Sequence, residues 1–169
     1  MNISTMFIQS LFAFFVSLGF GILFNIKGNK LFYAGIGGGL GWFISIYCES
    51  LGLNTTSSFF IASIIFSIYS EIMARVLKTP VTTLIICALI PLVPGGGMYY
   101  TMYEAINGNI MKAIELGIDT MASAGSLALG IIFISTLTRL FLRAKRRREF
   151  RELEKISKKI SKKNLYKNK

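Results

Sequence analysis

The sequence predicts an all-α, polytopic integral membrane protein with about five transmembrane helices, the fourth of them broken at a proline–glycine motif. Hydrophobic residues make up 53% of the 169 residues and charged residues only 16%, whereas a typical soluble domain carries about 25% charged residues. Five segments are long and apolar enough to cross a hydrocarbon core of about 30 Å, which takes roughly 20 helical residues. The net charge is concentrated at the end of the chain, since residues 139–169 hold fourteen bases and three acids.

These patterns divide the chain into a transmembrane domain, residues 1–143, and a basic cytoplasmic tail, residues 144–169. The composition does not fit a soluble enzyme or a nucleic-acid-binding domain, so no nucleic-acid partner is expected. The chain has no His, which excludes Ser–His and Cys–His nucleophiles and His metal sites. We therefore expect no catalytic residue, metal or cofactor. Cys48 and Cys87 lie in apolar runs and are expected to be buried free thiols.

The predicted spans cover residues 5–26, 31–49, 56–74, 80–100 and 118–142. The first has no small-x-small cleavage site, so we expect it to be retained as a helix. Because backbone groups in lipid must find their hydrogen-bond partners within the chain, these segments are expected to be helices and not open strands. Asp119 is then expected to cap the start of the last span.

Basic residues alternate between successive loops. The first loop carries Lys27 and Lys30, the second none, the third Arg75 and Lys78, and the fourth a single Lys112. Cytoplasmic loops are enriched in Lys and Arg. The pattern therefore predicts a cytoplasmic C-terminus and an N-terminus on the outside of the cell (plasma) membrane.

Small residues recur every four positions on two spans, and such spacing lets helix backbones approach closely. Packing between helices is the simplest interpretation, and a substrate path along the small-residue face is the alternative. The residues concerned are Gly35, Gly37, Gly39 and Gly41 on the second span, and Ala122, Ser126 and Gly130 on the fifth.

Polar residues form one stripe on each of the second and third spans. The stripes are Gly41–Ser45–Glu49 and Ser63–Ser67–Glu71, and each step of four residues stays on one helical face. Arg75 lies four residues after Glu71, which predicts an ion pair between them near the cytoplasmic end. Ionisable residues in spans are functional candidates, so Glu49, Glu71 and Arg75 are candidate gate or coupling residues.

The fourth span holds all three prolines of the chain and the run PLVPGGG at residues 91–97. Thr79 followed by Pro80 predicts a helix start, and the helix can run to residue 90, about 16 Å, or half of the hydrocarbon core. Proline removes a backbone donor, and three glycines can adopt positive φ. We therefore expect a break near the bilayer midplane, with a second helix resuming at Met98.

A break at that depth predicts a binding site for an anion. Free N–H groups at Gly96, Gly97 and Met98 would form a helix N-terminus, which attracts carboxylates, and discontinuous helices of this kind bind substrates in secondary transporters. The alternative is a kinked, purely structural helix. Thr82 and Thr83 are further candidate hydroxyl donors. The candidate substrate-binding residues are Pro91, Pro94, Gly95, Gly96, Gly97, Met98, Tyr99 and Tyr100.

The tail is compatible with a helix that has one apolar stripe, and it carries most of the bases. Near a membrane surface each base is worth about 1 kcal/mol of attraction to anionic lipid, so the tail is expected either to bind the cytoplasmic leaflet or to serve only as a topology signal. The stripe consists of Phe150, Leu153, Ile156 and Ile160.

Three segments resemble the threonine/serine exporter (ThrE-type) family, in particular its short YjjB-like form, which matches the C-terminal half of the full-length exporters. They are GGGLGWFI at 37–44, EIMARVLKTPVT at 71–82 and IPLVPGGGMYYTM at 90–102. The resemblance extends over about residues 8–142; the basic tail lies outside it.

This resemblance implies a five-helix half-transporter of a secondary exporter. Its substrates would be small carboxylates, either threonine and serine or dicarboxylates such as succinate. It also implies a second membrane subunit that supplies the other half of the transporter, and hence a hetero-oligomer. The alternative function is a non-transporting membrane scaffold or regulatory subunit that uses the tail as its contact.

Overall fold

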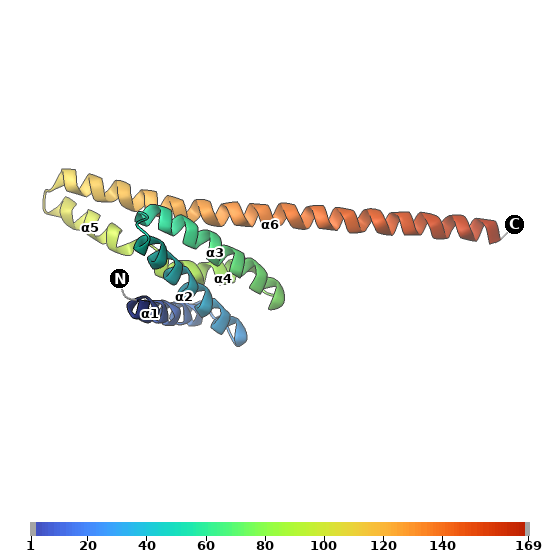
Figure 1. The fold of residues 1–169 in the computed structure, drawn as a ribbon, viewed down its shortest axis with the longest axis horizontal. Coiled ribbons are helices and arrows are strands. Elements are labelled where there is room, and N and C mark those ends of the chain that lie inside the picture. Colours follow the sequence, from blue (N-terminus) through green and yellow to red (C-terminus); the bar gives the residue numbers. More distant parts are fainter. Residues whose placement is uncertain (1–2, 168–169) are drawn as a thin grey trace. The chain divides into compact units, whose positions relative to one another are not determined.

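The computed structural model describes the backbone of residues 3–167 and the side chains of residues 3–144 and 147. Within this part of the chain every regular element is helical (Figure 1), which confirms the all-α prediction. Contacts divide the chain into two units, Met1–Ile134 and Ser135–Lys169. The first unit holds the bundle and everything described below as a site. The predicted domain boundary at residues 143/144 stays a prediction.

The helices confirm the predicted multi-pass architecture. Four are long and apolar enough to span a membrane, and a fifth span is formed by a pair of short helices joined at a bend of 48°. In chain order the elements are α1 (Ile3–Leu23), α2 (Asn29–Ser50), α3 (Thr55–Val76), α4 (Val81–Leu89), the 3-10 helix η1 (Ile90–Leu92), α5 (Gly95–Ile106) and α6 (Ile110–Lys167).

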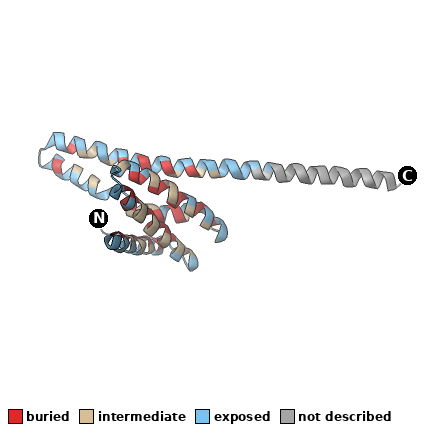
Figure 2. Cartoon of the chain, in the orientation of Figure 1, coloured by how far each residue is buried: buried red, intermediate tan, exposed pale blue. Residues whose placement is uncertain are grey.

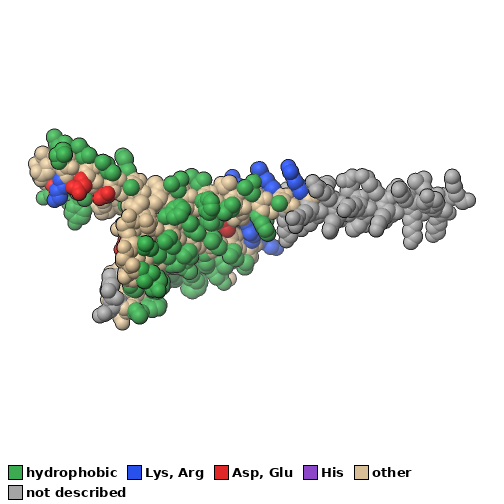
Figure 3. Space-filling view, turned by 45° about the horizontal axis from the view of Figure 1, so that its top comes forward, with side chains coloured by type: hydrophobic (Ala, Val, Ile, Leu, Met, Phe, Trp, Pro, Cys, Tyr) green, Lys and Arg blue, Asp and Glu red, His purple; other side chains and the backbone are tan. Residues whose placement is uncertain are grey.

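Helix α2 lies at the centre of the bundle and contacts α1, α3, α4 and η1. Half of its most apolar stretch is buried, against 22% for α1, and Figure 2 shows the buried positions concentrated on the inner helices. The large apolar side chains of α1 and of the α5–α6 hairpin remain exposed, and hydrophobic side chains cover much of the face in Figure 3. In a membrane this apolar surface faces lipid or another subunit.

The glycines of α2 explain why α2 can lie at the centre. A Cβ at Gly35 or Gly39 would press on Phe14 of α1, and one at Gly37 would press on Ala88 of α4. A Cβ at Gly41 would meet Leu92 of η1. Each glycine therefore lets a neighbouring helix approach closely, and the predicted helix-packing role is confirmed.

The small-residue face of α6 includes the predicted Ser126 and Gly130, but its first member differs from the predicted one. Ala122 is exposed, whereas Ser123, Ser126 and Gly130 are buried. A Cβ at Gly130 would collide with the Ser63 hydroxyl of α3. The packed face therefore begins at Ser123 and is directed towards α3.

Each of the four loops between spans follows a helix end closed by the same hydrogen-bond pattern. The N–H groups of Ile26, Leu53, Thr79 and Asn109 donate to carbonyls five residues earlier. This Schellman geometry needs a residue at positive φ just before the donor. The residues that adopt it are Asn25, Gly52, Lys78 and Gly108.

Three predicted boundaries were wrong. Helix α4 begins at Val81 with Pro80 as its N-cap, one residue later than expected. Helix α5 begins at Gly95 instead of Met98, and α6 begins at Ile110, so Asp119 lies inside the helix and does not cap it. The predicted stripe on the tail falls on side chains outside the described residues: Phe150, Leu153, Ile156 and Ile160.

Candidate functional site at the broken span

The break in the fourth span is made by its prolines. Helix α4 tightens into the 3-10 helix η1 around Pro91. Two residues, Val93 and Pro94, then lie between helices, and α5 starts at Gly95. Among the described residues, positive φ occurs only in the loops between spans, so the three glycines do not use this freedom. The glycines instead form the first turn of α5, which therefore carries no side chains of its own at these three positions.

A hydroxyl from α1 compensates for the missing donor at Pro91. In an unbroken helix the N–H of residue 91 would bond to the carbonyl of Cys87, four residues earlier, but proline has no N–H. Ser17 Oγ donates to the Cys87 carbonyl at 2.9 Å, and both side chains are fully buried. In a membrane interior an unpaired carbonyl is costly, so this hydrogen bond makes the break tolerable.

Gly38 of α2 makes room for this hydrogen bond. A Cβ there would collide with Ser17 Oγ and would lie 3.3 Å from Pro91 Cγ. The hydroxyl from α1, the glycine of α2 and the proline of η1 therefore meet at one point. This contact fixes the N-terminal side of the break to the bundle.

The start of α5 leaves two backbone donors free. The N–H of Gly95 donates to the Val93 carbonyl at 2.7 Å, and that of Met98 donates to Pro94 at 3.1 Å. The hydrogen bonds of the described residues include none donated by the N–H of Gly96 or Gly97. Two of the three predicted free donors are therefore present, and Met98 is not one of them.

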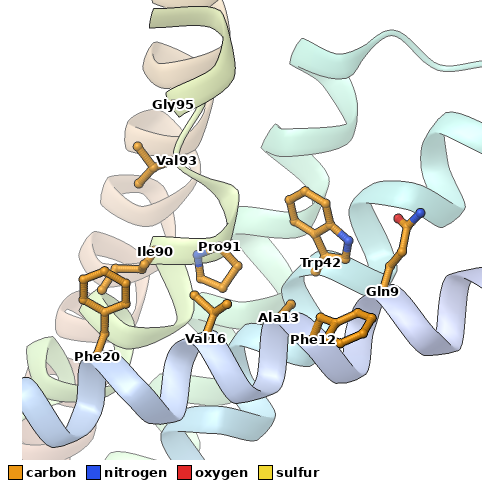
Figure 4. A pocket seen from close by; sticks show the side chains of 10 residues that line it. All are labelled: Gln9, Phe12, Ala13, Val16, Phe20, Trp42, Ile90, Pro91, Val93 and Gly95. Carbon is orange, nitrogen blue, oxygen red and sulfur yellow. The ribbon is translucent and has the colours of Figure 1, made fainter. Parts of the chain in front are cut away.

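An apolar groove of about 690 Å³ reaches the break from α1 (Figure 4). Phe12, Val16 and Phe20 of α1 line one side of it, and Trp42 of α2 lines another. Two of the predicted site residues, Pro91 and Gly95, belong to its wall. The groove offers little to a polar solute and suits an apolar chain.

A second, more polar cavity of about 490 Å³ also reaches the break. The start of α3 contributes hydroxyl and amide groups, and α6 contributes a carboxylate and two hydroxyls. Two predicted site residues, Pro94 and Gly97, complete the wall. The polar side chains that line it are Asn54, Thr55, Thr56, Asp119, Thr120 and Ser123.

Gly97 is a point of close approach between α5 and α6 beside this cavity. A Cβ at Gly97 would collide with Thr120 Oγ1. The Thr120 hydroxyl donates to the Leu116 carbonyl at 2.6 Å, and Thr101 Oγ1 donates to the Gly97 carbonyl at 2.7 Å. The first turn of α5 is therefore held against α6 with its free N–H end at the cavity.

The aromatic and threonine candidates do not join this arrangement. Met98, Tyr99 and Tyr100 are exposed on α5, and Tyr99 stacks on Tyr103 at a centroid separation of 6.2 Å. Thr82 and Thr83 lie in the first turn of α4, at the opposite end of that helix from the break. None of these residues lines either cavity.

The charged candidates lie away from the break. Arg75 Nη2 is 3.0 Å from Glu71 Oε2, which confirms the predicted ion pair, and Glu71 is buried near the end of α3. Glu49 is exposed near the end of α2. Neither cavity includes these residues, and their gate or coupling role stays a prediction. No group of three or more metal-ligating side chains is found among the described residues.

Sequence reasoning missed Asp119, Thr120 and Ser123 as site residues. They were missed because α6 begins at Ile110, several residues before the apolar run from which the span was predicted. The signal was present in the turn Asn107–Asn109, where Gly108 takes positive φ and the Asn109 carbonyl accepts the N–H of Ala113 at 3.0 Å. A helix that starts there turns Asp119 and Ser123, four residues apart, towards one side.

Comparison with known protein families identifies a related family. The family model described as threonine/serine exporter, ThrE, matches residues 9–137, which include the break and both cavities. No curated protein and no solved structure matches the chain.

Proposed function

Because the chain belongs to the threonine/serine exporter (ThrE) family, we propose that it forms one half of a secondary exporter of small carboxylates. The family and the apolar helices make it a multi-pass membrane protein with an exporter-type transport role. The proposal goes further in naming the substrates as threonine and serine or dicarboxylates such as succinate. It also assigns the other half of the transporter to a second membrane subunit.

The observation that carries the proposal is the N-terminus of α5 at the break. The N–H groups of Gly96 and Gly97 have no acceptor among the described hydrogen bonds, and Gly97 lines the polar cavity. Backbone donors at a helix N-terminus favour an anion through their dipoles. The substrate carboxylate would therefore bind at this turn, where the glycines themselves carry no side chain.

The proposed orientation follows from the charges of the loops. Lys27, Arg75 and Lys78 flank the loops at one end of the bundle, and the fourteen bases of residues 139–169 follow the last span. By the enrichment of bases on the cytoplasmic side, that end faces the cytoplasm of a plasma-membrane protein. The N-terminus then lies outside, and the tail can bind anionic lipid.

The exposed apolar surface supports a partner subunit. Phe12 and Phe15 of α1 are 65% and 57% exposed, and α1 adjoins the apolar groove beside the break. A partner helix that packs there would close the groove and complete the path.

Gly96→Leu tests the proposed site. A Cβ at Gly96 meets no atom within 4 Å, so a side chain can begin there without a clash, and it adds bulk beside the free N–H groups. We expect efflux of the carried carboxylate, threonine or succinate, to fall by about tenfold or more, because a charge-assisted hydrogen bond is worth roughly 1.5–3 kcal/mol. The measurement is efflux of labelled substrate from cells that contain equal amounts of inserted protein.

Gly125→Leu is the matched control, since Gly125 also has open space around it and lies on α6 away from both cavities. It should leave efflux unchanged. Normal efflux from the Gly96→Leu variant would remove the break from the transport mechanism.

A further inference from the structure

The polar cavity presents opposite charges at two parts of its wall. Gly97 brings the N–H end of α5 to one part, and Asp119 of α6 brings a carboxylate to another. Asp119 is the only Asp or Glu, and no Lys or Arg is present, among the residues that line the cavity. A ligand that carries both a carboxylate and a cationic group would match this arrangement.

Asp119 has no ion-pair partner within the described part of the chain. The ion pairs found there join Arg75 to Glu71 and Lys112 to Glu104, at 3.0 Å and 2.7 Å. Lys112 is the nearest base along α6, and it is taken up by Glu104. An aspartate that lines a cavity in a membrane protein without a base beside it is a candidate for binding a cation.

The hydroxyls around Asp119 are arranged as acceptors. Thr120 Oγ1 donates its proton to the Leu116 carbonyl, so only its lone pairs remain for a ligand. Thr56 Oγ1 and Ser123 Oγ lie 3.4 Å apart in the cavity wall, so one of the two hydroxyls donates to the other and both oxygens keep lone pairs that can accept. An ammonium group has three donors and no acceptor, and these oxygens suit it.

We propose that Asp119 binds the cationic amino group of the transported substrate and makes the polar cavity selective for zwitterions over dianions. This inference rests on the proposed function, because it assumes that the carboxylate of the substrate binds the N–H groups of Gly96 and Gly97. The zwitterion then spans the cavity from the start of α5 to α6. A dicarboxylate would bring its second negative charge towards Asp119 and would be repelled.

The cavity has room for such a ligand. Its volume of about 490 Å³ falls within the roughly 300–1,000 Å³ of small-molecule sites. Side chains from α3 and α6 line the cavity with polar groups, so the ligand can contact these helices as well as the start of α5.

The test compares two compounds that differ only in the amino group, threonine and 3-hydroxybutyrate. Labelled forms of both are offered, with labelled succinate, to inverted membrane vesicles that contain the full-length chain and the membrane subunit that co-purifies with it. Asp119→Asn keeps the shape of the side chain and removes its charge. Glu115→Gln is the matched control, because Glu115 is an exposed acid one turn earlier on α6 that does not line the cavity.

We expect Asp119→Asn to raise the KM for threonine by about tenfold or more, because the substitution weakens a hydrogen bond between two charged groups. The KM for 3-hydroxybutyrate should stay the same, and that for succinate should stay the same or fall. Glu115→Gln should behave as the unsubstituted chain with all three compounds. A purely structural role for Asp119 would instead lower transport of threonine and 3-hydroxybutyrate alike.

Two outcomes would overturn the inference while leaving the proposed function intact. One is threonine transport by Asp119→Asn that equals that of the unsubstituted chain, and the other is an equal loss for threonine and 3-hydroxybutyrate. If the unsubstituted chain with its subunit carries none of the three compounds, the proposed function fails first, and this inference fails with it.

Discussion

The hydroxyl of Ser17 offers the sharpest test of how the chain tolerates its broken span. Ser17→Ala removes the donor that reaches the Cys87 carbonyl at 2.9 Å. Pro91, four residues after Cys87, cannot replace this donor, because proline has no N–H. The substitution therefore leaves one backbone acceptor unpaired in the interior of the bundle.

The expected loss follows from burial. Ser17 and Cys87 are both fully buried, and an unsatisfied buried polar group costs about 1–3 kcal/mol. For chains of 150–250 residues each kcal/mol shifts the midpoint of unfolding by roughly 2–4 °C, so the variant should melt about 2–12 °C lower. The measurement is thermal unfolding of the purified full chain in mild detergent, followed by circular dichroism.

Ser10→Ala is the control on the same helix. Its hydroxyl donates to the Met6 carbonyl one turn earlier at 2.9 Å, a carbonyl that the helix itself can also pair. Its removal should therefore change the free energy of unfolding by less than about 0.5 kcal/mol, as for substitutions away from critical contacts. The midpoint of unfolding should shift correspondingly little.

Pro91→Ala completes a double-mutant cycle. An alanine at 91 restores a backbone N–H at the end of α4, which can donate to the Cys87 carbonyl. Ser17→Ala should then cost much less in the Pro91→Ala background than in the original chain. Equal costs in the two backgrounds, or a Ser17→Ala variant as stable as the Ser10→Ala control, would refute the role assigned to this hydroxyl.

Three further predictions concern the rest of the chain. Gly130→Val should destabilise the chain by about 1–3 kcal/mol through overpacking against α3. Gly125→Val, whose Cβ meets open space, should leave stability unchanged or slightly higher, because valine is a better helix former than glycine. Thermal unfolding measures both. Arg75→Gln should cost about 1–3 kcal/mol because it leaves the buried Glu71 unpaired, and Glu71→Gln in the same chain should recover most of that loss in the same assay. Deleting residues 145–169 should leave efflux per inserted molecule largely intact; complete loss of efflux with normal insertion would favour the scaffold interpretation of the tail.

The architecture was predictable because lipid imposes strong constraints. Span length, the glycine spacing of α2 and the ion pair between Glu71 and Arg75 depend on sequence distances within one helix or between adjacent helices. The prolines at 91 and 94 likewise marked the break at the correct place. These features are local, and local features can be read from a sequence.

The polar cavity was less predictable because three separate segments form it. Nothing in the sequence says that Thr56 lies 3.4 Å from Ser123, 67 residues later, or that Thr120 approaches Gly97. The glycines of the motif do not take positive φ in α5, because glycine permits positive φ without requiring it. Their role as site residues stays a prediction. Ser17 was missed for a related reason, since a serine in an apolar helix gives no sign of which carbonyl it will meet.

The two sides of the break differ in how firmly they are held, and this difference separates its two roles. On the α4 side the buried residues include Leu84, Cys87 and Leu92, whereas α5 buries only Glu104. Local stability follows buried contacts, so changes at Ser17 should lower the melting temperature, whereas changes at Gly96 should lower transport with little effect on melting. If both substitutions changed both properties by similar degrees, the structural and transport roles of the motif could not be assigned to opposite sides of the break.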